Sequence, residues 1–342
     1  MWNRRRLMGA VAASGLVAVT ARGEPEGNLN DRLTGDLSPV HDPCMIKGDG
    51  LYHVFCTSQM REDHEGIRGL IHWRTSPDML NWTFKGSVMP AFPDWVIGEI
   101  PDTRGAWAPD ISYAGGLYRL YWAASLFGKN HSVIGLLTTP TLDTTRPDFG
   151  WKDEGLVIRS REGDRYNAID PNHIVDTDGR HWLSFGSFWS GLQLVELDPT
   201  TGKPKKRAKI KRIAGRSQPG AIEAPFIFRR GDGYYLVAAY DFCCRGVNSS
   251  YYTCVGRSKT IDGPYLDDTG KKLTDDGGSA LLRADQDSRF KGPGGASVFE
   301  ENGTYFIVYH AYDAEKNGKP ALRIQALDWT SDGWPKPSGV AV

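Results

Sequence analysis

Four acidic residues lie close to prolines at widely separated places in the chain. They occur in the segments His41-Asp42-Pro43, Ala108-Pro109-Asp110, Ile169-Asp170-Pro171 and Glu223-Ala224-Pro225. Carboxyl groups that share one pocket repel one another, and burial raises the pKa of at least one of them. Hydrolysis of a glycosidic bond needs this combination, because one carboxyl must be protonated while another is ionised. The acids therefore predict a glycosidase site, provided that the fold brings them together.

Asp42 and Glu223 are the best candidates for the catalytic pair. Glu223 stands in the apolar segment 221–225, which should keep it protonated near neutral pH and suit it as general acid. Asp42 follows His41 and should ionise readily, as a general base must. Asp170 would then be a third carboxylate that orients Glu223 and tunes its pKa through like-charge coupling.

The acids mark the start of a pattern that occurs five times. An apolar stretch is followed by a tight turn containing glycine and then by an aromatic and apolar strand. The turns and strands are Asp49-Gly50 with 51–55, Gly115-Gly116 with 117–122, Asp178-Gly179 with 181–185, Asp232-Gly233 with 234–238, and Asn302-Gly303 with 304–309. The fifth repeat begins at Gly292-Pro293-Gly294. A repeat of this length fits a four-stranded sheet with one longer loop.

Five such sheets arranged radially form an all-β, five-bladed β-propeller with the catalytic carboxylates around its central channel. Equivalent positions in every blade then lie at the same end of the axis, which gathers distant acids into one pocket. A helix-rich fold is excluded, because no long stretch keeps a 3.6-residue apolar period. No domain boundary stands out, so residues 28–342 are predicted to form one catalytic domain.

An alternative interpretation is that each acid caps a turn or accepts backbone hydrogen bonds. The recurrence of the acids favours catalysis for Asp42, Asp170 and Glu223. Asp110 is the exception, since Pro109 precedes it and displaces it relative to the other repeats. We expect its side chain to face a blade interface as a structural hydrogen-bond acceptor.

The N-terminal segment, residues 1–27, has the pattern of a secretory signal peptide and leader. Arg4, Arg5 and Arg6 precede an apolar run over 7–19, and small residues favour cleavage near Ala21. The run is too short for a stable membrane anchor. We expect a secreted protein, extracellular or periplasmic, and the paired arginines leave twin-arginine export open. The balance of 41 basic and 41 acidic residues in 342 argues against a nucleic-acid partner.

Several ordered motifs resemble those of glycoside hydrolase family 43, and within it those of endo-1,5-α-L-arabinanases. The matching segments are His41–Pro43, Trp107–Asp110, Tyr166–Pro171, Phe185–Gly191 and Ile222–Pro225. Further matches are Trp151–Gly155, Cys243–Ser249, Gly256–Ser258 and His310–Asp313. The similarity extends from about Ser38 to Pro335, nearly the whole mature chain.

The resemblance implies a five-bladed propeller that hydrolyses the α-1,5-linked arabinan backbone of pectin with inversion. It assigns Asp42 as general base, Glu223 as general acid and Asp170 as pKa modulator. Inversion predicts carboxyl groups of the acid and base about 6.5–9.5 Å apart, which leaves room for a water molecule. Residues implied to line the sugar subsites are Gly128, Asn167, Ala168, Ile169, Ser187, Phe188 and Trp189. Trp107 is a further candidate as a stacking platform. Without the repeats, ordinary packing between blades would be the preferred interpretation of Trp107 and Trp189.

The resemblance also raises the question of a metal ion. Many relatives carry a histidine after Gly-Pro-Gly in the last repeat, which binds calcium in the central channel, whereas this chain has Gly295. Calcium prefers oxygen ligands and water, so the substitution does not exclude it. Two interpretations of His310 stay open, a metal ligand in the channel and a histidine packed in its strand. A structural Ca²⁺ is thus the one cofactor considered, and no organic cofactor is expected.

Other activities stay open at this stage. An exo-acting arabinofuranosidase or a β-xylosidase would use the same three acids, and a non-catalytic propeller would use them only to bind sugar hydroxyls. The expected partner is arabinan or an arabino-oligosaccharide, bound by a monomer. Cys243 and Cys244 would form either a vicinal disulfide or two buried thiols.

Overall fold

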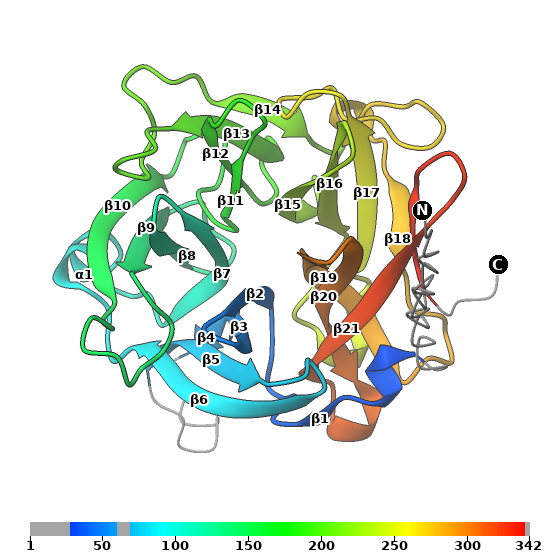
Figure 1. The fold of residues 1–342 in the computed structure, drawn as a ribbon. Coiled ribbons are helices and arrows are strands. Elements are labelled where there is room, and N and C mark those ends of the chain that lie inside the picture. Colours follow the sequence, from blue (N-terminus) through cyan, green and yellow to red (C-terminus); the bar gives the residue numbers. More distant parts are fainter. Residues whose placement is uncertain (1–27, 60–68, 339–342) are drawn as a thin grey trace, which may run out of the picture.

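The protein folds into a five-bladed β-propeller, which confirms the fold predicted from the repeats (Figure 1). The computed structural model describes residues 28–59 and 69–338. The five sheets surround a central axis and follow one another along the chain, apart from one short strand, β4, which joins the second sheet. The predicted signal peptide and leader, residues 1–27, lie outside the described residues.

Each blade is one sheet. The first has the order β1-β6-β5-β3-β2, with β1 Thr34–Gly35, β2 Cys44–Gly48, β3 Leu51–Cys56, β5 Leu70–Ser76 and β6 Asn81–Met89. The second has the order β10-β9-β8-β7-β4, with β4 Ser58–Gln59, β7 Gly105–Ala114, β8 Leu117–Ser125, β9 Ser132–Thr139 and β10 Lys152–Ser160. The third contains β11 Asn172–Val175, β12 His181–Phe185, β13 Leu192–Leu197 and β14 Lys211–Ala214.

The last two blades keep sequence order. The fourth contains β15 Ile222–Arg230, β16 Gly233–Tyr240, β17 Tyr252–Ser258 and β18 Ser279–Leu282. The fifth contains β19 Phe290–Glu301, β20 Thr304–Asp313, β21 Lys319–Trp329 and β22 Pro335–Pro337. The predicted turn-and-strand units thus correspond to the second strand of each blade, β3, β8, β12, β16 and β20.

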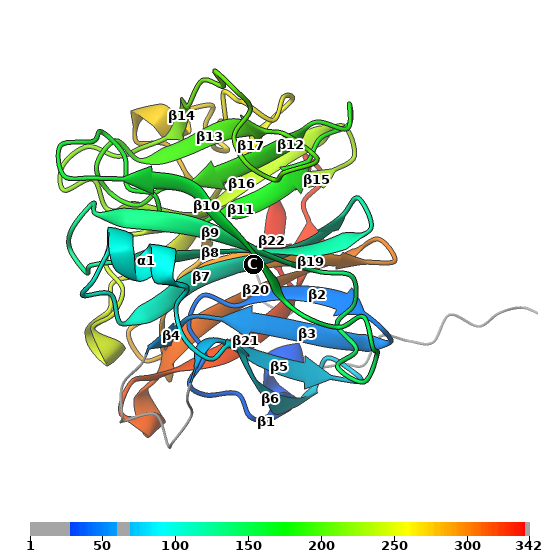
Figure 2. The same ribbon diagram turned by 90° about the vertical axis from the view of Figure 1, so that its left-hand side faces the viewer.

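Helical segments are few and short. The α-helix α1, Asp94–Glu99, lies on the outside of the second blade (Figures 1 and 2). The 3₁₀ segments are η1 Leu29–Asp31, η2 Gly246–Asn248, η3 Leu273–Asp275 and η4 Ala314–Lys316. Within residues 28–59 and 69–338, no helix has the length and apolar character needed to cross a membrane.

The core is divided into five hydrophobic clusters, each between two neighbouring blades. Trp122 and Phe55, for example, belong to the cluster between the first and second blades, and both are fully buried. The fifth cluster joins the last blade to the first and contains Val54 and Ile324. Blade packing therefore fixes the angle between successive sheets and, with it, the position of every residue at the hub.

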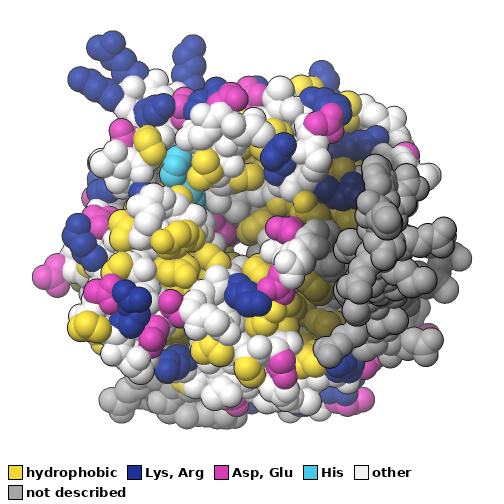
Figure 3. Space-filling model, in the orientation of Figure 1, with side chains coloured by type: hydrophobic (Ala, Val, Ile, Leu, Met, Phe, Trp, Pro, Cys, Tyr) yellow, Lys and Arg dark blue, Asp and Glu magenta, His cyan; other side chains and the backbone are white. Residues whose placement is uncertain are grey.

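Hydrogen bonds from the N-terminal segment close the ring. The Val40 N–H donates to the Pro320 carbonyl at 3.0 Å, and the Leu322 N–H donates to the Leu37 carbonyl at 2.8 Å. On the face shown in Figure 3, acidic and basic side chains are interspersed around a hollow near the hub.

Candidate active site

The hub end of every blade has the same unusual backbone. One residue in each blade adopts a left-handed conformation, with φ between 41° and 56°: Asp42, Ala108, Asp170, Ala224 and Gly295. Positive φ is uncommon for residues that carry a Cβ. In three blades the pairing of the first two strands skips this residue and the next, between Trp107 and Asp110, Glu223 and Phe226, and Gly294 and Ser297. These five positions are therefore structurally equivalent.

This equivalence corrects part of the sequence interpretation. Only Asp42 and Asp170 occupy equivalent positions, while Glu223 comes one residue earlier and Asp110 two residues later in the repeat. The three predicted catalytic acids nevertheless line one pocket. Glu223 reaches this pocket from the position that Trp107 occupies in the second blade, and Trp107 lines it as well.

The pocket has a volume of about 640 Å³ and is partly open to solvent. This volume lies within the range of about 300–1,000 Å³ that is usual for a ligand site. A second, much smaller cavity of about 30 Å³ is lined by Asp42, Asp110, Asp170 and four hub prolines. A partly open pocket at the hub suits a ligand that extends beyond it into solvent.

Asp42 is held by several neighbours. The Thr57 hydroxyl donates to Asp42 Oδ2 at 2.7 Å, and His41 Nδ1 lies 2.8 Å from the same oxygen. The Asp42 N–H donates to His310 Nδ1 at 3.1 Å. Burial by itself would raise the pKa of Asp42, but the charge of His41 and these hydrogen bonds lower it to about 2. Asp42 is therefore ionised at neutral pH, as a general base must be.

Glu223 has the opposite tendency. The Ser187 hydroxyl donates to Glu223 Oε2 and the Tyr251 hydroxyl donates to Oε1, both at 2.7 Å. Burial raises the pKa of Glu223 and outweighs these two hydrogen bonds, and the negative charge of Asp42 adds to the increase. The side chain is thus suited to hold a proton and deliver it.

Asp170 interacts electrostatically with both of the other acids. Its Oδ2 accepts the Ala224 N–H at 3.0 Å, which ties it to the residue after Glu223. Burial and then the charges of Glu223 and Asp42 raise the pKa of Asp170 well above its usual value. One ionised carboxylate therefore faces two carboxyls that favour the protonated form, a pattern that separates acid from base.

Most of the predicted sugar-binding residues line this pocket. They are Trp107, Gly128, Asn167, Ile169, Ser187, Phe188 and Trp189. Trp189 is 44% exposed and Phe127, which the sequence interpretation did not select, is 79% exposed at the same pocket. Both offer aromatic faces to a ligand rather than packing fully between blades.

Two predictions about individual residues have clear outcomes. Ala168 is not part of the wall, because it is fully buried in the cluster between the second and third blades and its N–H donates to Ser160 Oγ. Asp110 is 3% exposed and accepts hydrogen bonds from the His173 N–H at 2.7 Å and the Asn172 side chain at 3.4 Å. Asp110 is thus a structural acceptor, as expected.

Three residues that contact the acids were given no role from the sequence, His41, Thr57 and Tyr251, and neither was Tyr312, which contacts His41. His41 was visible next to Asp42, and Tyr312 belongs to the motif at 310–313. Tyr251 and Thr57 carry no local signal, since they reach the site only because their strands end at the hub.

His310 is completely buried, and its environment does not fit a calcium ion. Its Nδ1 accepts the Asp42 N–H, so in the neutral ring Nε2 carries the proton, and this atom has no hydrogen-bond partner among residues 28–59 and 69–338. Burial, followed by the charge of His41, lowers the pKa of His310 well below its usual value. The group His41, Asp42 and His310 offers two imidazoles and one carboxylate, whereas calcium prefers oxygen ligands. His310 and its two neighbours are therefore not a calcium site, and a calcium ion elsewhere in the central channel stays a prediction.

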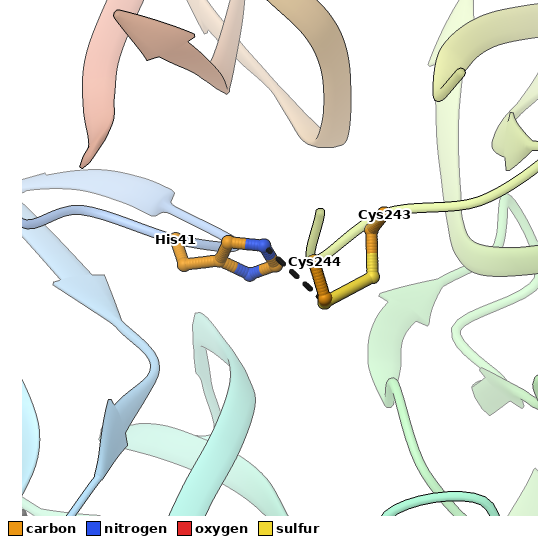
Figure 4. A group of neighbouring side chains, drawn as sticks. All are labelled: His41, Cys243 and Cys244. Atoms are coloured by element: carbon orange, nitrogen blue, oxygen red, sulfur yellow. Dashed lines mark hydrogen bonds between the residues drawn. A yellow bond between two sulfur atoms is a disulfide. The ribbon is translucent and has the colours of Figure 1, made fainter. Parts of the chain in front are cut away.

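Cys243 and Cys244 form a disulfide between adjacent residues, rather than two buried thiols. Both cysteines line the pocket, and Cys244 Sγ lies 3.9 Å from His41 Nε2. Figure 4 shows the disulfide and the His41 ring facing each other from different parts of the chain. The disulfide therefore lies next to His41, the residue that precedes Asp42 in the chain.

Comparison with known proteins agrees with the fold and identifies the family. The family "Glycosyl hydrolases family 43" matches residues 38–335. The chain is 44% identical over 298 residues to an extracellular endo-α-(1→5)-L-arabinanase 1 of Bacillus subtilis, covering 86% of this chain and 87% of that protein. It is 40% identical over 309 residues to an extracellular exo-α-(1→5)-L-arabinofuranosidase of Cellvibrio japonicus, covering 87% and 86%.

A solved structure gives the same result. The α-L-arabinanase of Cellvibrio cellulosa in complex with arabinohexaose superposes with a TM-score of 0.81 at 38% identity, covering 88% of this chain and 96% of that one. A five-bladed propeller with three carboxyl groups at the hub defines a glycoside-hydrolase type of site. The chain belongs to glycosyl hydrolase family 43.

Proposed function

We propose that this protein is a secreted, inverting arabinanase that cleaves internal α-1,5-L-arabinofuranosidic bonds. The observation that carries the proposal is the opposite protonation tendency of the acids in one pocket, with the pKa of Asp42 lowered to about 2 and the pKa values of Glu223 and Asp170 raised. A non-catalytic sugar-binding propeller has no need of this separation.

The proposed reaction is a single displacement by water. Asp42 removes a proton from a water molecule as that water attacks the anomeric carbon, while Glu223 protonates the oxygen of the departing sugar. Asp170 orients Glu223 through its bond to the Ala224 N–H, and its own pKa is raised by burial and by the charge of Glu223. After one turnover, the proton that Asp42 took up and the one that Glu223 lost are exchanged with solvent.

Names of relatives support arabinan as the substrate. The Bacillus subtilis relative is named an endo-arabinanase, and the Cellvibrio cellulosa structure is named as a complex with arabinohexaose. The partly open pocket and its exposed aromatic residues Phe127 and Trp189 suit a chain of several sugars. Both curated relatives are named extracellular, which supports secretion of this chain.

An exo-acting arabinofuranosidase is the second candidate, because the Cellvibrio japonicus relative carries that name at similar identity. The two modes share one chemistry and differ in whether one end of the groove is closed. A time course on linear, debranched arabinan separates them. We expect oligosaccharides of several lengths in the first minutes, whereas early release of mainly one short product would identify exo action.

The same assay tests the acid. Glu223→Gln should reduce kcat by roughly 10²–10⁴, the usual contribution of a general acid. The matched control is Asp110→Asn, which also converts a hub carboxyl to an amide and should keep the wild-type rate and product pattern. Full activity of Glu223→Gln would overturn the assignment of the acid.

A further inference from the structure

We propose that the Cys243–Cys244 disulfide is a positioning element for the general base, acting through the Cys244 backbone amide, Tyr312 and His41. The inference rests on the proposed role of Asp42. It assigns a function in the hydrolysis to a bond that makes no direct contact with any of the three carboxyl groups.

A continuous line of hydrogen bonds joins the disulfide to the base. The Cys244 N–H donates to the Tyr312 hydroxyl at 2.8 Å, and that hydroxyl lies 2.8 Å from His41 Nε2. His41 Nδ1 is in turn 2.8 Å from Asp42 Oδ2. Both ring nitrogens of His41 therefore have hydrogen-bond partners. The bond to the Tyr312 hydroxyl holds the ring in the orientation in which Nδ1 faces Asp42.

Stacking does not by itself decide which ring nitrogen of His41 faces Tyr312. His41 stacks on His310, with 3.6 Å between ring centroids, and a half-turn of the ring would keep this stacking while moving both nitrogens. The side chain of His41 is 19% exposed at the pocket. Tyr312, by contrast, is 3% exposed and packs edge-on against His310 at 5.3 Å between ring centroids. Tyr312 is thus held firmly by its packing, and its hydroxyl accepts a hydrogen bond from the Cys244 N–H.

The disulfide fixes the direction of that amide. A bond between adjacent cysteines closes a small ring that contains the peptide bond between them, so the N–H of Cys244 cannot turn freely. Cys244 has a φ of 65°, which residues with a Cβ adopt infrequently. Opening the ring would allow this residue to return to common backbone conformations and withdraw its N–H from Tyr312.

The rest of the loop has independent attachments. The Phe242 N–H donates to Ser250 Oγ and the Arg245 N–H donates to Ser249 Oγ. Gly246 packs so closely against Gly318 that a Cβ on Gly318 would lie 2.9 Å from Gly246 Cα. Breaking the disulfide should therefore release the Cys244 amide locally and leave the loop in place.

The bond can be opened selectively in the folded protein. The chain has five cysteines, and Cys44, Cys56 and Cys254 are free and buried. A small dithiol reductant breaks the Sγ–Sγ bond, each cysteine sulfur gains one proton and one electron, and the dithiol is oxidised to its cyclic disulfide. Titration of free thiols then counts the two that are released.

The test compares kcat and KM on a linear arabino-oligosaccharide before and after reduction, in the wild type and in Tyr312→Phe. We expect reduction to lower kcat of the wild type about three- to tenfold through misplacement of the base. Tyr312→Phe should by itself lower kcat by a similar factor. Reduction of the disulfide in this variant should then change kcat less than about twofold, because the effects of groups joined by one series of hydrogen bonds are not additive. The matched control is Tyr235→Phe in the fourth blade, which loses a hydroxyl bonded to the Gly333 carbonyl and should keep the full response.

Three results would overturn the inference: unchanged kcat with two thiols released, a change in KM alone, or an equal response in Tyr312→Phe and the wild type. Cys243→Ser/Cys244→Ser should behave like the reduced wild type and not respond to the reductant. Failure of the proposed function is recognised separately with Asp42→Asn. If this variant keeps its activity, the base is wrongly assigned. If Asp42→Asn is inactive but reduction of the disulfide leaves kcat of the wild type unchanged, only the positioning role is rejected.

Discussion

Two stacked histidines with opposite proton affinities lie beside the general base. Burial opposes charge on His41, but Asp42 and Tyr312 raise the pKa of His41 well above its usual value. His310, 3.6 Å away, has a lowered pKa because it is buried and faces His41. Two rings this close are not both charged, because like charges repel. The Asp42 carboxylate favours the charge on His41. His41 is thereby the counter-charge that keeps Asp42 ionised.

His41→Gln should move the pH dependence of activity. Glutamine keeps a hydrogen-bond donor but has no charge, so the pKa of Asp42 rises from about 2 toward or above its usual 3.8. Asp42 must be ionised, and activity is lost as pH falls through its pKa, so the acidic limb should shift upward by about 1–2 pH units. The basic limb should also rise, because His41 lowers the pKa of Glu223.

The profile of kcat/KM against pH measures both limbs. His131→Gln is the matched control, since His131 does not line the pocket. An acidic limb that stays in place in His41→Gln would show that another group keeps Asp42 ionised.

At this scale the sequence predicted the acids but not their partners. Asp42, Asp170 and Glu223 were recognisable because each stands in a repeated, proline-containing segment. Tyr251 and Thr57 were not, because a single hydroxyl residue at the end of a strand has no pattern of its own. The error at Ala168 has the same origin, since a small residue in a matching motif gives no sign of which side of the backbone faces the pocket.

At the scale of the element, the left-handed residue at the hub is the feature that positions the acids. Pairing skips two residues near the beginning of the first strand of a blade, and the side chains at this point, such as Trp107 and Glu223, line the pocket at the hub. The repeats could be found from turns such as Asp49-Gly50, but their register could not. Proline comes before Asp110 and after Asp170, and only the backbone shows that Ala108 is the equivalent of Asp170.

Gly295 gives a direct test of this element. A Cβ at this position would overlap Asp42 Oδ1 and lie 2.9 Å from His310 Nδ1, and φ is 55°. Gly295→Ala should therefore displace Asp42 and lower kcat by about 10- to 100-fold. Gly303→Ala is the matched control, because Gly303 has a φ of 82° but nothing within 4 Å of its added Cβ.

Both glycine variants carry a cost in stability from positive φ, so thermal unfolding should shift similarly in the two. Only Gly295→Ala should lose kcat, measured on the same linear arabino-oligosaccharide. Equal activity of the two variants would mean that the site tolerates a shift of Asp42 or of His310.

At the scale of the whole molecule, the ring needs a closing contact that no single blade contains. The five clusters between blades are equivalent in kind, and the sequence predicted their number from the repeats. It did not predict how the first and last blades join, because the joining residues lie outside the repeated pattern. Asn30 is one of them, with Oδ1 accepting the Ile324 N–H at 2.8 Å and Nδ2 donating to the Tyr309 hydroxyl at 3.3 Å.

Asn30→Ala should weaken ring closure without affecting catalysis. Asn30 is 5% exposed, so its loss leaves the buried Ile324 N–H without a partner. Such a group costs about 1–3 kcal/mol in the free energy of unfolding. Asn28→Ala is the matched control, because the Asn28 side chain accepts only the Asn30 N–H within its own 3₁₀ segment. The midpoints of urea unfolding measure the difference, and a loss in Asn30→Ala no larger than in Asn28→Ala would show that the ring is closed by the backbone bonds of Val40 and Leu322 instead.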